Sequence, residues 1–272
     1  MPLGTLFVVA TPIGNLEDIT LRALRTLKEA DLIACEDTRQ SGKLLSHFGI
    51  TTGTLSYHEH NEAARTADLI GRLQNGTTVA LITDAGTPLV SDPGYRLVTA
   101  AIAAGVPVVP IPGANAALGA LAAAGLATDE FRFCGFLPPK SGQRRKALEE
   151  LQAETCTLVF YEAPHRILDA LEDITAVYGP RPVVVARELT KLHEEFLRGS
   201  AAEIHTQLAA RPSVKGEITL LIGKGEPVSD NTPIPQAVAA LEAAGVPRMD
   251  AIKQVARDRG LSKRDVYREI SG

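Results

Sequence analysis

Three loops rich in glycine and proline carry the residue types that most clearly suggest chemistry in this sequence. They are residues 11–15 (TPIGN), 83–94 (TDAGTPLVSDPG) and 110–116 (PIPGANA), and each directly follows a short apolar run typical of a β-strand. In an open α/β sheet, ligands bind at the carboxyl ends of the strands. One such loop is an ordinary turn between a strand and a helix, but three in one region predict a shared ligand cleft.

The composition of these loops indicates what kind of ligand they would bind. Glycine lets the backbone approach closely, and proline fixes the loop shape without offering an N–H group. We therefore expect backbone carbonyls to face the ligand, together with the carboxylates of Asp84 and Asp92. Such a wall suits a compact organic cation with amine and adenine donors better than a polyphosphate, which needs N–H groups and lysines. Alternatively, the two aspartates only cap loops or helices.

A second group of polar residues also occurs at expected strand ends. Residues 161–166 (YEAPHR) follow one strand, and residues 186–191 (ARELTK) close another. Glu162 alone could be a surface acid and His165 alone a helix-start residue, but together these segments indicate the second wall of a cleft. The sequence contains no GxGxxG, GxxxxGK[ST], HExxH or GxSxG motif. It therefore gives no support to a nicotinamide or nucleoside triphosphate site, a metalloprotease or an α/β-hydrolase.

Alternating strands and helices must position these loops. In the first part of the chain the apolar runs predict strands at 5–10, 31–36, 78–83 and 107–111, and helices at 21–30, 61–74 and 93–104. In the second part we expect strands at 131–136, 157–161, 182–188, 194–198 and 217–223. The short connection after residue 188 predicts a hairpin, so the second sheet should be mixed and the first mainly parallel.

The predicted fold class is therefore α/β, with two α/β domains and the ligand cleft between them. We place the domains at residues 1–128 and 129–225, followed by a linker and a small helical segment at 226–272. The turn-forming residues of 225–235 (GEPVSDNTPIP) mark the linker.

The segment after the linker is basic in an acidic chain. Residues 232–272 hold seven Lys or Arg and five Asp or Glu, whereas the whole chain has a net charge of −4. A helix at 250–259 should stop at Gly260, and Ser262 with Asp265 matches a capping box for the next helix. With Ala256, Gly260 and Val266 as its packing core, this pair resembles a helix-turn-helix. A helical cap on the preceding domain is an equally good interpretation.

Composition excludes several broad classes of protein. At 272 residues, with 45% hydrophobic and 22% charged residues, the chain should fold into about two domains and is neither fibrous nor disordered. The net charge of −4 does not suit a bulk nucleic-acid binder. Widely spaced Cys35, Cys134 and Cys156 argue against structural zinc and disulfides and favour a reducing compartment. Residues 97–128 carry no charge, but their prolines favour buried elements over a membrane span.

Five ordered motifs carry a resemblance to a known family. They are TDAGTPLVSDPG, IPGANA, TLVFYEAPHR, ARELTKLHEEFLRG and KGEITLLIGKGE. In this order they resemble the tetrapyrrole methylase family of S-adenosylmethionine-dependent methyltransferases. The resemblance covers about residues 3–225. Within the family, the chain most resembles members that methylate the ribose 2′-oxygen of a cytidine in the decoding region of 16S rRNA. Where tetrapyrrole-modifying members carry a Gly-Asp-Pro loop, this chain has Gly86-Thr87-Pro88.

The resemblance implies S-adenosylmethionine folded between two domains, no metal, a homodimer and a cytoplasmic protein acting on 16S rRNA, with the small ribosomal subunit as its setting. In this sequence the implied cofactor-binding residues are Ile13, Gly14, Asp84, Gly86, Thr87, Pro88, Asn115, Ala116, Tyr161, Glu162, Leu189 and Thr219. Methyl transfer is an in-line displacement, so the main work of such a site is to align the reacting atoms and exclude water.

A ribose hydroxyl needs a nearby base or a strong hydrogen-bond acceptor, which the resemblance does not name. Residues 35–39 (CEDTR) and 57–60 (YHEH) supply acidic, basic and imidazole groups for the cleft rim. As a hypothesis, Asp37 orients or deprotonates the hydroxyl and Arg39 holds a phosphate. A structural ion pair between them is an equally good interpretation.

RNA would also need a basic surface, and residues 140–146 (KSGQRRK) supply four positive charges and no negative one. We predict RNA contacts from Lys140, Arg144, Arg145, Lys146, Arg166 and Lys191, extended by Arg198. The alternative is a solvated helix start. Two further functions stay open: a tetrapyrrole methyltransferase of the same fold, and a non-catalytic nucleic-acid regulator that uses the terminal helices.

Overall fold

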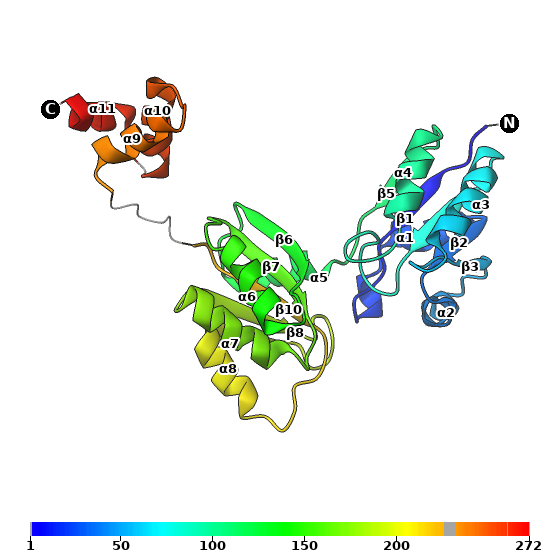
Figure 1. Ribbon diagram of the computed structural model, residues 1–272. Helices are drawn as coiled ribbons and strands as arrows, with labels where there is room; N and C mark the ends of the chain where they lie inside the picture. Colours follow the sequence, from blue (N-terminus) through cyan, green and yellow to red (C-terminus); the bar gives the residue numbers. More distant parts are fainter. Residues whose placement is uncertain (1, 226–231, 260, 272) are drawn as a thin grey trace.

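Two five-stranded sheets and a separate group of C-terminal helices make up the molecule in a computed structural model that describes residues 2–225, 232–259 and 261–271 (Figure 1). The strands are β1 (Leu6–Val9), β2 (Leu32–Cys35), β3 (Thr54–Ser56), β4 (Val79–Ile82), β5 (Val108–Ile111), β6 (Phe131–Phe136), β7 (Thr157–Glu162), β8 (Pro182–Arg187), β9 (Glu195–Ser200) and β10 (Ile218–Ile222). The α-helices are α1 (Leu21–Glu29), α2 (Thr38–His47), α3 (Glu62–Gln74), α4 (Tyr95–Ala103), α5 (Ala116–Ala124), α6 (Ser141–Glu150), α7 (Ile167–Tyr178), α8 (Ala201–Ala209), α9 (Ile234–Ala243), α10 (Arg248–Asp258) and α11 (Lys263–Ser271).

The first sheet has the strand order β3-β2-β4-β1-β5, and every pair in it is parallel. Its central strands are short apolar runs, as sheets covered on both faces require, and all four residues of β4 are buried. Leu27 of α1 and Leu45 of α2 pack in one core cluster, whereas Leu69 of α3 and Leu97 of α4 pack in another. All carboxyl ends consequently meet at one edge of this sheet.

The second sheet is mixed, in the order β6-β7-β10-β8-β9. Strands β6 and β7 are parallel, and the remaining pairs are antiparallel. The predicted hairpin is confirmed as β8 and β9, which pair from Pro182↔Ser200 to Arg187↔Glu195. Helices α6, α7 and α8 supply Leu148, Leu171 and Ile204 to the core on one face. The α/β fold class with two sheets is thereby confirmed.

Helix α5 packs with the second sheet, so the boundary between the two units differs from the predicted one. Ala117, Ala120 and Leu121 pack against Val159, Val184 and Leu221 of the second sheet, on the face that α6–α8 leave open (Figure 1). The alanine-rich helix follows β5 in sequence, but it is the second sheet that buries its apolar side. By packing, the first unit therefore ends between β5 and α5, earlier than the predicted boundary at residues 128 and 129.

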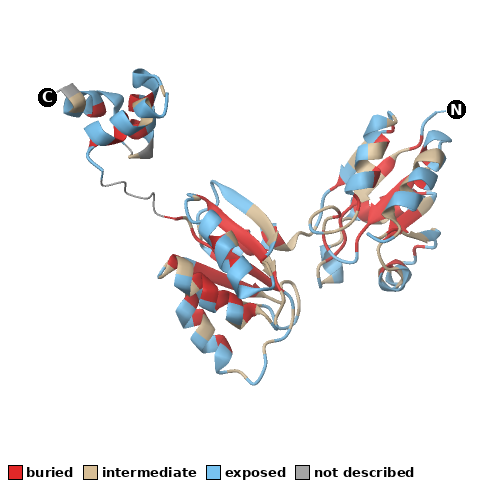
Figure 2. Ribbon diagram, in the orientation of Figure 1, coloured by how far each residue is buried: buried red, intermediate tan, exposed pale blue. Residues whose placement is uncertain are grey.

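The C-terminal helices α9, α10 and α11 form their own core (Figure 2). Ala256 and Val266 are buried in it, as predicted, together with Val238 and Ile252. The predicted cap before α11 is present, because Ser262 Oγ accepts the backbone N–H of Asp265 at 3.2 Å. Of the predicted linker, residues 226–231 lie outside the described residues, as does Gly260. The last two residues of the predicted linker, Ile234 and Pro235, begin α9 instead, where proline fits the first turn.

Among the described residues, no helix is both long and apolar enough to cross a membrane.

Candidate functional site

The three predicted loops meet at the carboxyl edge of the first sheet and are joined by hydrogen bonds. Thr11 and Gly86 exchange backbone bonds, with N···O distances of 2.9 and 3.1 Å. Thr87 Oγ1 donates to the carbonyl of Ala114 at 3.2 Å, which ties the second loop to the third. Gly86 has φ +85°, and a Cβ there would lie 3.3 Å from Ile13 Cγ2, so glycine allows this close contact.

The second wall comes from the second sheet, whose mixed directions bring strand beginnings and ends to the same edge. Glu162 at the end of β7 pairs with Ile218 at the start of β10, and Ile218 also pairs with Arg187 at the end of β8. Loop 188–191, which follows β8, reaches the first unit, because Asn15 N–H donates to Thr190 Oγ1 at 3.1 Å. The two sheets thus present their edges to one space.

A cavity of about 380 Å³ occupies this space and lies within the usual size range of small-molecule sites. Nine of the twelve predicted cofactor-binding residues line it: Ile13, Gly86, Thr87, Asn115, Ala116, Tyr161, Glu162, Leu189 and Thr219.

Gly14, Asp84 and Pro88 are not among the lining residues. Gly14 serves the contact between the units instead, since a Cβ there would lie 2.5 Å from Lys191 Cγ. The Asp84 carboxylate accepts the backbone N–H of Asp37 at 3.2 Å. These two residues therefore shape the surroundings of the cavity, and their direct binding roles stay predictions.

Sequence reasoning missed other parts of the lining, namely Ala85, Val90, Ser91, Phe136, Ala163, Pro164, Glu217 and Ile218. Most of them are sequence neighbours of predicted residues, and the quoted loops already contained them. Glu217 and Ile218 directly precede the predicted Thr219, and the antiparallel direction of β10 places this strand start at the ligand edge.

Glu162 is the most buried acid of the cavity wall. Its side chain is fully buried, and Oε1 accepts Arg166 Nε at 2.8 Å and the backbone N–H of Ala163 at 2.7 Å. No described residue offers a hydrogen bond to the other oxygen, Oε2. A buried acceptor without a partner is costly, so a donor from a ligand would stabilise it.

These features fit the ligand that the sequence resemblance implies. Apolar lining from Ile13, Val90 and Leu189 suits an adenine ring, and the unpartnered Oε2 of Glu162 suits an amine donor. No Lys or Arg is among the lining residues, which does not suit a polyphosphate. S-adenosylmethionine, with its amine, sulfonium and adenine groups, therefore matches the chemistry of the wall.

Asp92, predicted as an acceptor, also lines the cavity. Its Oδ1 lies 2.8 Å from Thr83 Oγ1, and the same hydroxyl lies 3.0 Å from Glu36 Oε2. Burial raises the pKa of Asp92 to about 6, with the Thr83 hydrogen bond opposing and the charges of Glu36 and Asp84 assisting.

Asp37 and Arg39 are not among the residues that line the cavity. Asp37 is the N-cap of α2: its Oδ1 accepts the Arg39 backbone N–H at 2.8 Å, and that bond lowers the pKa of the carboxyl group. The Arg39 side chain is 90% exposed and forms a weak ion pair with Asp37 at 3.5 Å. This arrangement matches the alternative interpretation, a structural ion pair between Asp37 and Arg39. The predicted catalytic roles of the two residues stay predictions.

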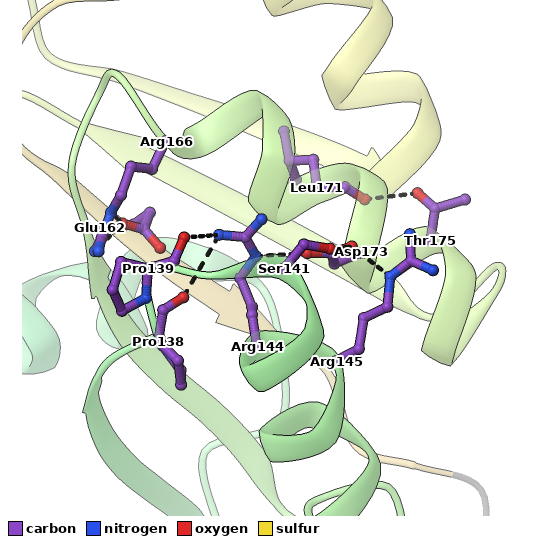
Figure 3. A network of polar contacts seen from close by, with 10 residues as sticks. All are labelled: Pro138, Pro139, Ser141, Arg144, Arg145, Glu162, Arg166, Leu171, Asp173 and Thr175. Carbon is purple, nitrogen blue, oxygen red and sulfur yellow. Dashed lines mark hydrogen bonds and ion pairs between the residues drawn. The ribbon is translucent and has the colours of Figure 1, made fainter.

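Only part of the basic run 140–146 is exposed. Figure 3 shows Arg144 and Arg145 reaching toward Asp173. Arg144 is 2% exposed, and its Nε donates to Asp173 Oδ2 at 2.6 Å. Arg145 Nε and Ser141 Oγ bind the other oxygen of Asp173 at 2.5 and 2.9 Å. Burial opposes ionisation of Asp173, but these bonds together hold its pKa below the ordinary value. The prediction that Arg144 contacts RNA is therefore wrong, because this side chain holds α6 against α7.

The other basic residues predicted to contact RNA differ in their exposure and in their ion pairs. Lys140 and Lys146 are exposed, and the Arg145 side chain is about half exposed. Arg166 and Lys191 are both committed to carboxylates, Arg166 to Glu162 and Lys191 to Glu188 and Glu217 at 2.8 and 2.9 Å.

Arg198 also has a structural role, because it donates to the carbonyls of Ala123 and Ala124 at the end of α5. Of the basic residues named for RNA, Lys140 and Lys146 are exposed near the start of α6, and Arg145 is about half exposed while its Nε binds Asp173.

No group of three or more His, Cys, Asp or Glu side chains in the described ranges could hold a metal ion.

A family model described as Tetrapyrrole (Corrin/Porphyrin) Methylases matches residues 5–205. The chain belongs to this family. Within it, the chain is 53% identical to a protein from Halalkalibacterium halodurans and 49% identical to one from Haemophilus influenzae, both named "Ribosomal RNA small subunit methyltransferase I". These alignments cover 97% of this chain, and 93% and 95% of the respective relatives.

A solved structure shows the same fold at lower identity. Uroporphyrin-III C-methyltransferase from Thermus thermophilus, complexed with S-adenyl homocysteine, has a TM-score of 0.57 and 20% identity to this chain. The match covers 81% of this chain and 97% of that one.

Proposed function

We propose that this protein transfers a methyl group from S-adenosylmethionine to the ribose 2′-oxygen of a cytidine in the decoding region of 16S rRNA. The observation that carries the proposal is near-full-length similarity, at about half identity, to relatives named as methyltransferases of small-subunit ribosomal RNA. The cavity supports it, because apolar surface and acceptor oxygens of both sheets line one space. Bound there, S-adenosylmethionine would supply an activated methyl group on a positively charged sulfur.

The residues of the cavity would act mainly by orientation. Glu162 Oε2 would accept a hydrogen bond from the ligand amine, while Arg166 holds the other oxygen and fixes the carboxylate. The backbone loops at Gly86 and Asn115 would fix the rest of the ligand against the edge of the first sheet. Enclosure between two sheets would exclude water and keep the reacting atoms in line.

The acceptor RNA would approach from outside the cleft. We propose that Lys140, Arg145 and Lys146 contact its phosphates, because these charges remain exposed near the start of α6. In keeping with the names of the relatives, we propose that the substrate is RNA of the small ribosomal subunit. We also propose that the protein works in the cytoplasm as a homodimer, as the sequence resemblance implies.

Labelled S-adenosylmethionine offered with several acceptors would test the substrate class. The acceptors are assembled small subunits that lack ribose methylation, naked 16S rRNA and a porphyrinoid. We expect label in RNA and none in the porphyrinoid. Label in the porphyrinoid alone would contradict the RNA assignment and favour a tetrapyrrole methyltransferase. No binding of S-adenosylhomocysteine and no transfer to any acceptor would favour a non-catalytic regulator.

Glu162→Gln tests the cofactor assignment separately. We expect at least about tenfold weaker binding of S-adenosylhomocysteine by calorimetry, because a charge-assisted bond to the amine is lost. Glu172→Gln, a surface carboxylate on α7, is the matched control and should bind as the wild type does. Unchanged affinity in Glu162→Gln would place the amine elsewhere.

A further inference from the structure

Three carboxylates line the cavity, and their surroundings separate their roles. Glu162 is compensated by Arg166. Glu217 is 76% exposed and paired with Lys191. Asp92, by contrast, forms no ion pair with any described Lys, Arg or His. It is therefore the carboxylate of the wall whose charge has no compensating cation.

Asp92 and Glu36 share a single hydroxyl donor. Thr83 Oγ1 is within hydrogen-bond distance of both Asp92 Oδ1 and Glu36 Oε2, at 2.8 and 3.0 Å. A hydroxyl has one proton to donate, so it can satisfy only one of two ionised carboxylates. Glu36 and Asp92 are both partly buried, so two ionised carboxylates beside one hydroxyl are costly. The cluster of Glu36, Thr83 and Asp92 is therefore built to take up one proton.

The fold brings this cluster together at the end of the first sheet. Glu36 and Thr83 directly follow β2 and β4, which pair through Cys35↔Ile82. The chain then turns back through Leu89 and Ser91, both with positive φ, at 72° and 66°. This costly conformation returns Asp92 to the strand end beside Thr83.

We propose that Asp92 accepts the proton of the attacking ribose hydroxyl, with Thr83 and Glu36 as positioning residues; this inference rests on the proposed function. The hydroxyl O–H bond breaks and its proton passes to the Asp92 oxygen that Thr83 does not bind. The hydroxyl oxygen forms the new bond to the methyl carbon. The bond from that carbon to sulfur breaks, and its electron pair remains on the sulfur.

The groups around Asp92 determine how the rate of methyl transfer should depend on pH. Glu36 faces it from the end of β2, Asp84 from the loop after β4 and Tyr161 from β7. Both acids raise the pKa of Asp92, which is about 6. Below that pH Asp92 is protonated and cannot act as a base, so the transfer rate should increase as the pH rises through about 6. Removing the charge of Glu36 should move this increase to lower pH.

The test is single-turnover methyl transfer to small subunits, measured from pH 5 to pH 8.5, with binding of S-adenosylhomocysteine measured in parallel. We expect Asp92→Asn to lower the transfer rate by ~100-fold or more, with the ligand dissociation constant within about threefold of wild type. Glu36→Gln should retain most activity at high pH, with its acid limb shifted to lower pH. Asp68→Asn on α3 is the control carboxylate and should match the wild type.

Several outcomes would overturn the assignment. A rate for Asp92→Asn within tenfold of wild type, with the same acid limb, would exclude Asp92 as the base. Loss of ligand binding equal to the loss of rate would make Asp92 a binding residue. A larger loss in Asp37→Asn than in Asp92→Asn would move the role to Asp37.

A second readout does not depend on activity. Infrared spectra of protein labelled with ¹³C-aspartate should show a carboxylic-acid band that titrates near pH 6 and is missing in Asp92→Asn. Absence of the band would contradict the shared proton. If the band is present but the wild type methylates no RNA at any pH, the proposed function fails, and the hydroxyl assignment fails with it.

Discussion

At the scale of single residues, the carboxylates of the cavity wall differ in whether a cation compensates their charge. Arg166 balances Glu162 and Lys191 balances Glu217, whereas Asp92 faces the Thr83 hydroxyl, Tyr161 and two further acids, with no ion pair to a described cation. The sequence placed Asp92 at a strand end and named it as an acceptor. It could not show that Glu36, which is 56 positions earlier, would share the same hydroxyl. That contact depends on parallel pairing of β2 with β4.

The raised pKa of Asp92 predicts an effect on stability. The folded pKa of about 6 exceeds the ordinary value of 3.8, so the ionised carboxylate destabilises the fold as the pH rises between these values. We expect Asp92→Asn to increase the free energy of unfolding by ~1–3 kcal/mol at pH 7.5 and to have little effect at pH 4. Urea denaturation at both pH values measures this, and equal effects at the two would contradict the pKa argument.

At the scale of secondary-structure elements, buried and bridging ion pairs hold neighbouring segments together. Local composition identified the start of α6 as a basic run, but it could not reveal that Arg144 meets Asp173, 29 residues later. Helix α2 was missed because its sequence is polar overall and contains Gly42, and because Asp37 was considered for catalysis before capping. Short β3, with three residues, offers too little periodicity to detect.

Arg144→Ala should destabilise the protein strongly. The substitution leaves Asp173 buried with one strong partner fewer, and such losses cost ~3–5 kcal/mol. Lys146→Ala, two residues on and exposed, should change the free energy of unfolding by less than ~0.5 kcal/mol. Chemical denaturation of both variants checks this, and a small effect at Arg144 would show that the buried pair contributes little.

Glu195 predicts a loss of stability in acid. It accepts hydrogen bonds from Arg211, after α8, and from Arg187 on β8, and these lower its pKa to about 2. This stabilisation is complete above the ordinary pKa of 4.5 and is lost as the pH falls toward 2. Because Glu195 is partly exposed, we expect Glu195→Gln to cost ~1–2 kcal/mol at pH 7. The difference from wild type should shrink below pH 4.5, and a constant difference would contradict the argument.

At the scale of the whole molecule, two sheets of different topology share one ligand edge. The loops at strand ends were enough to predict the cleft, because parallel strands place their carboxyl ends at one edge of the sheet. This holds even when the first and last residues of each strand are predicted inexactly. The division of the chain was harder to predict. Alanine-rich α5 fits either sheet by composition, and only its packing on Val159 and Val184 assigns it to the second. The terminal helices have their own core, whereas the sequence left open whether they form a helix-turn-helix or a cap on the preceding domain.

A chain that ends at Gly225 should therefore keep the cofactor site. The cavity lining ends at Thr219, and the core of α9–α11 contains residues of that segment alone. We expect the shortened protein to unfold cooperatively and to bind S-adenosylhomocysteine within about twofold of the full chain. If RNA affinity falls while cofactor binding persists, the helices serve the acceptor. Loss of cofactor binding would show that they support the cleft.

We propose that the cleft between the two sheets directs a methyl group to a ribose oxygen of RNA. The most direct measurement is alkaline hydrolysis of small-subunit RNA after transfer from labelled S-adenosylmethionine, because a 2′-O-methyl group blocks cleavage at its own phosphodiester. We predict that the label appears in a hydrolysis-resistant dinucleotide containing methylated cytidine. Label released entirely in mononucleotides would contradict the claim, because it would place the methyl group on a base.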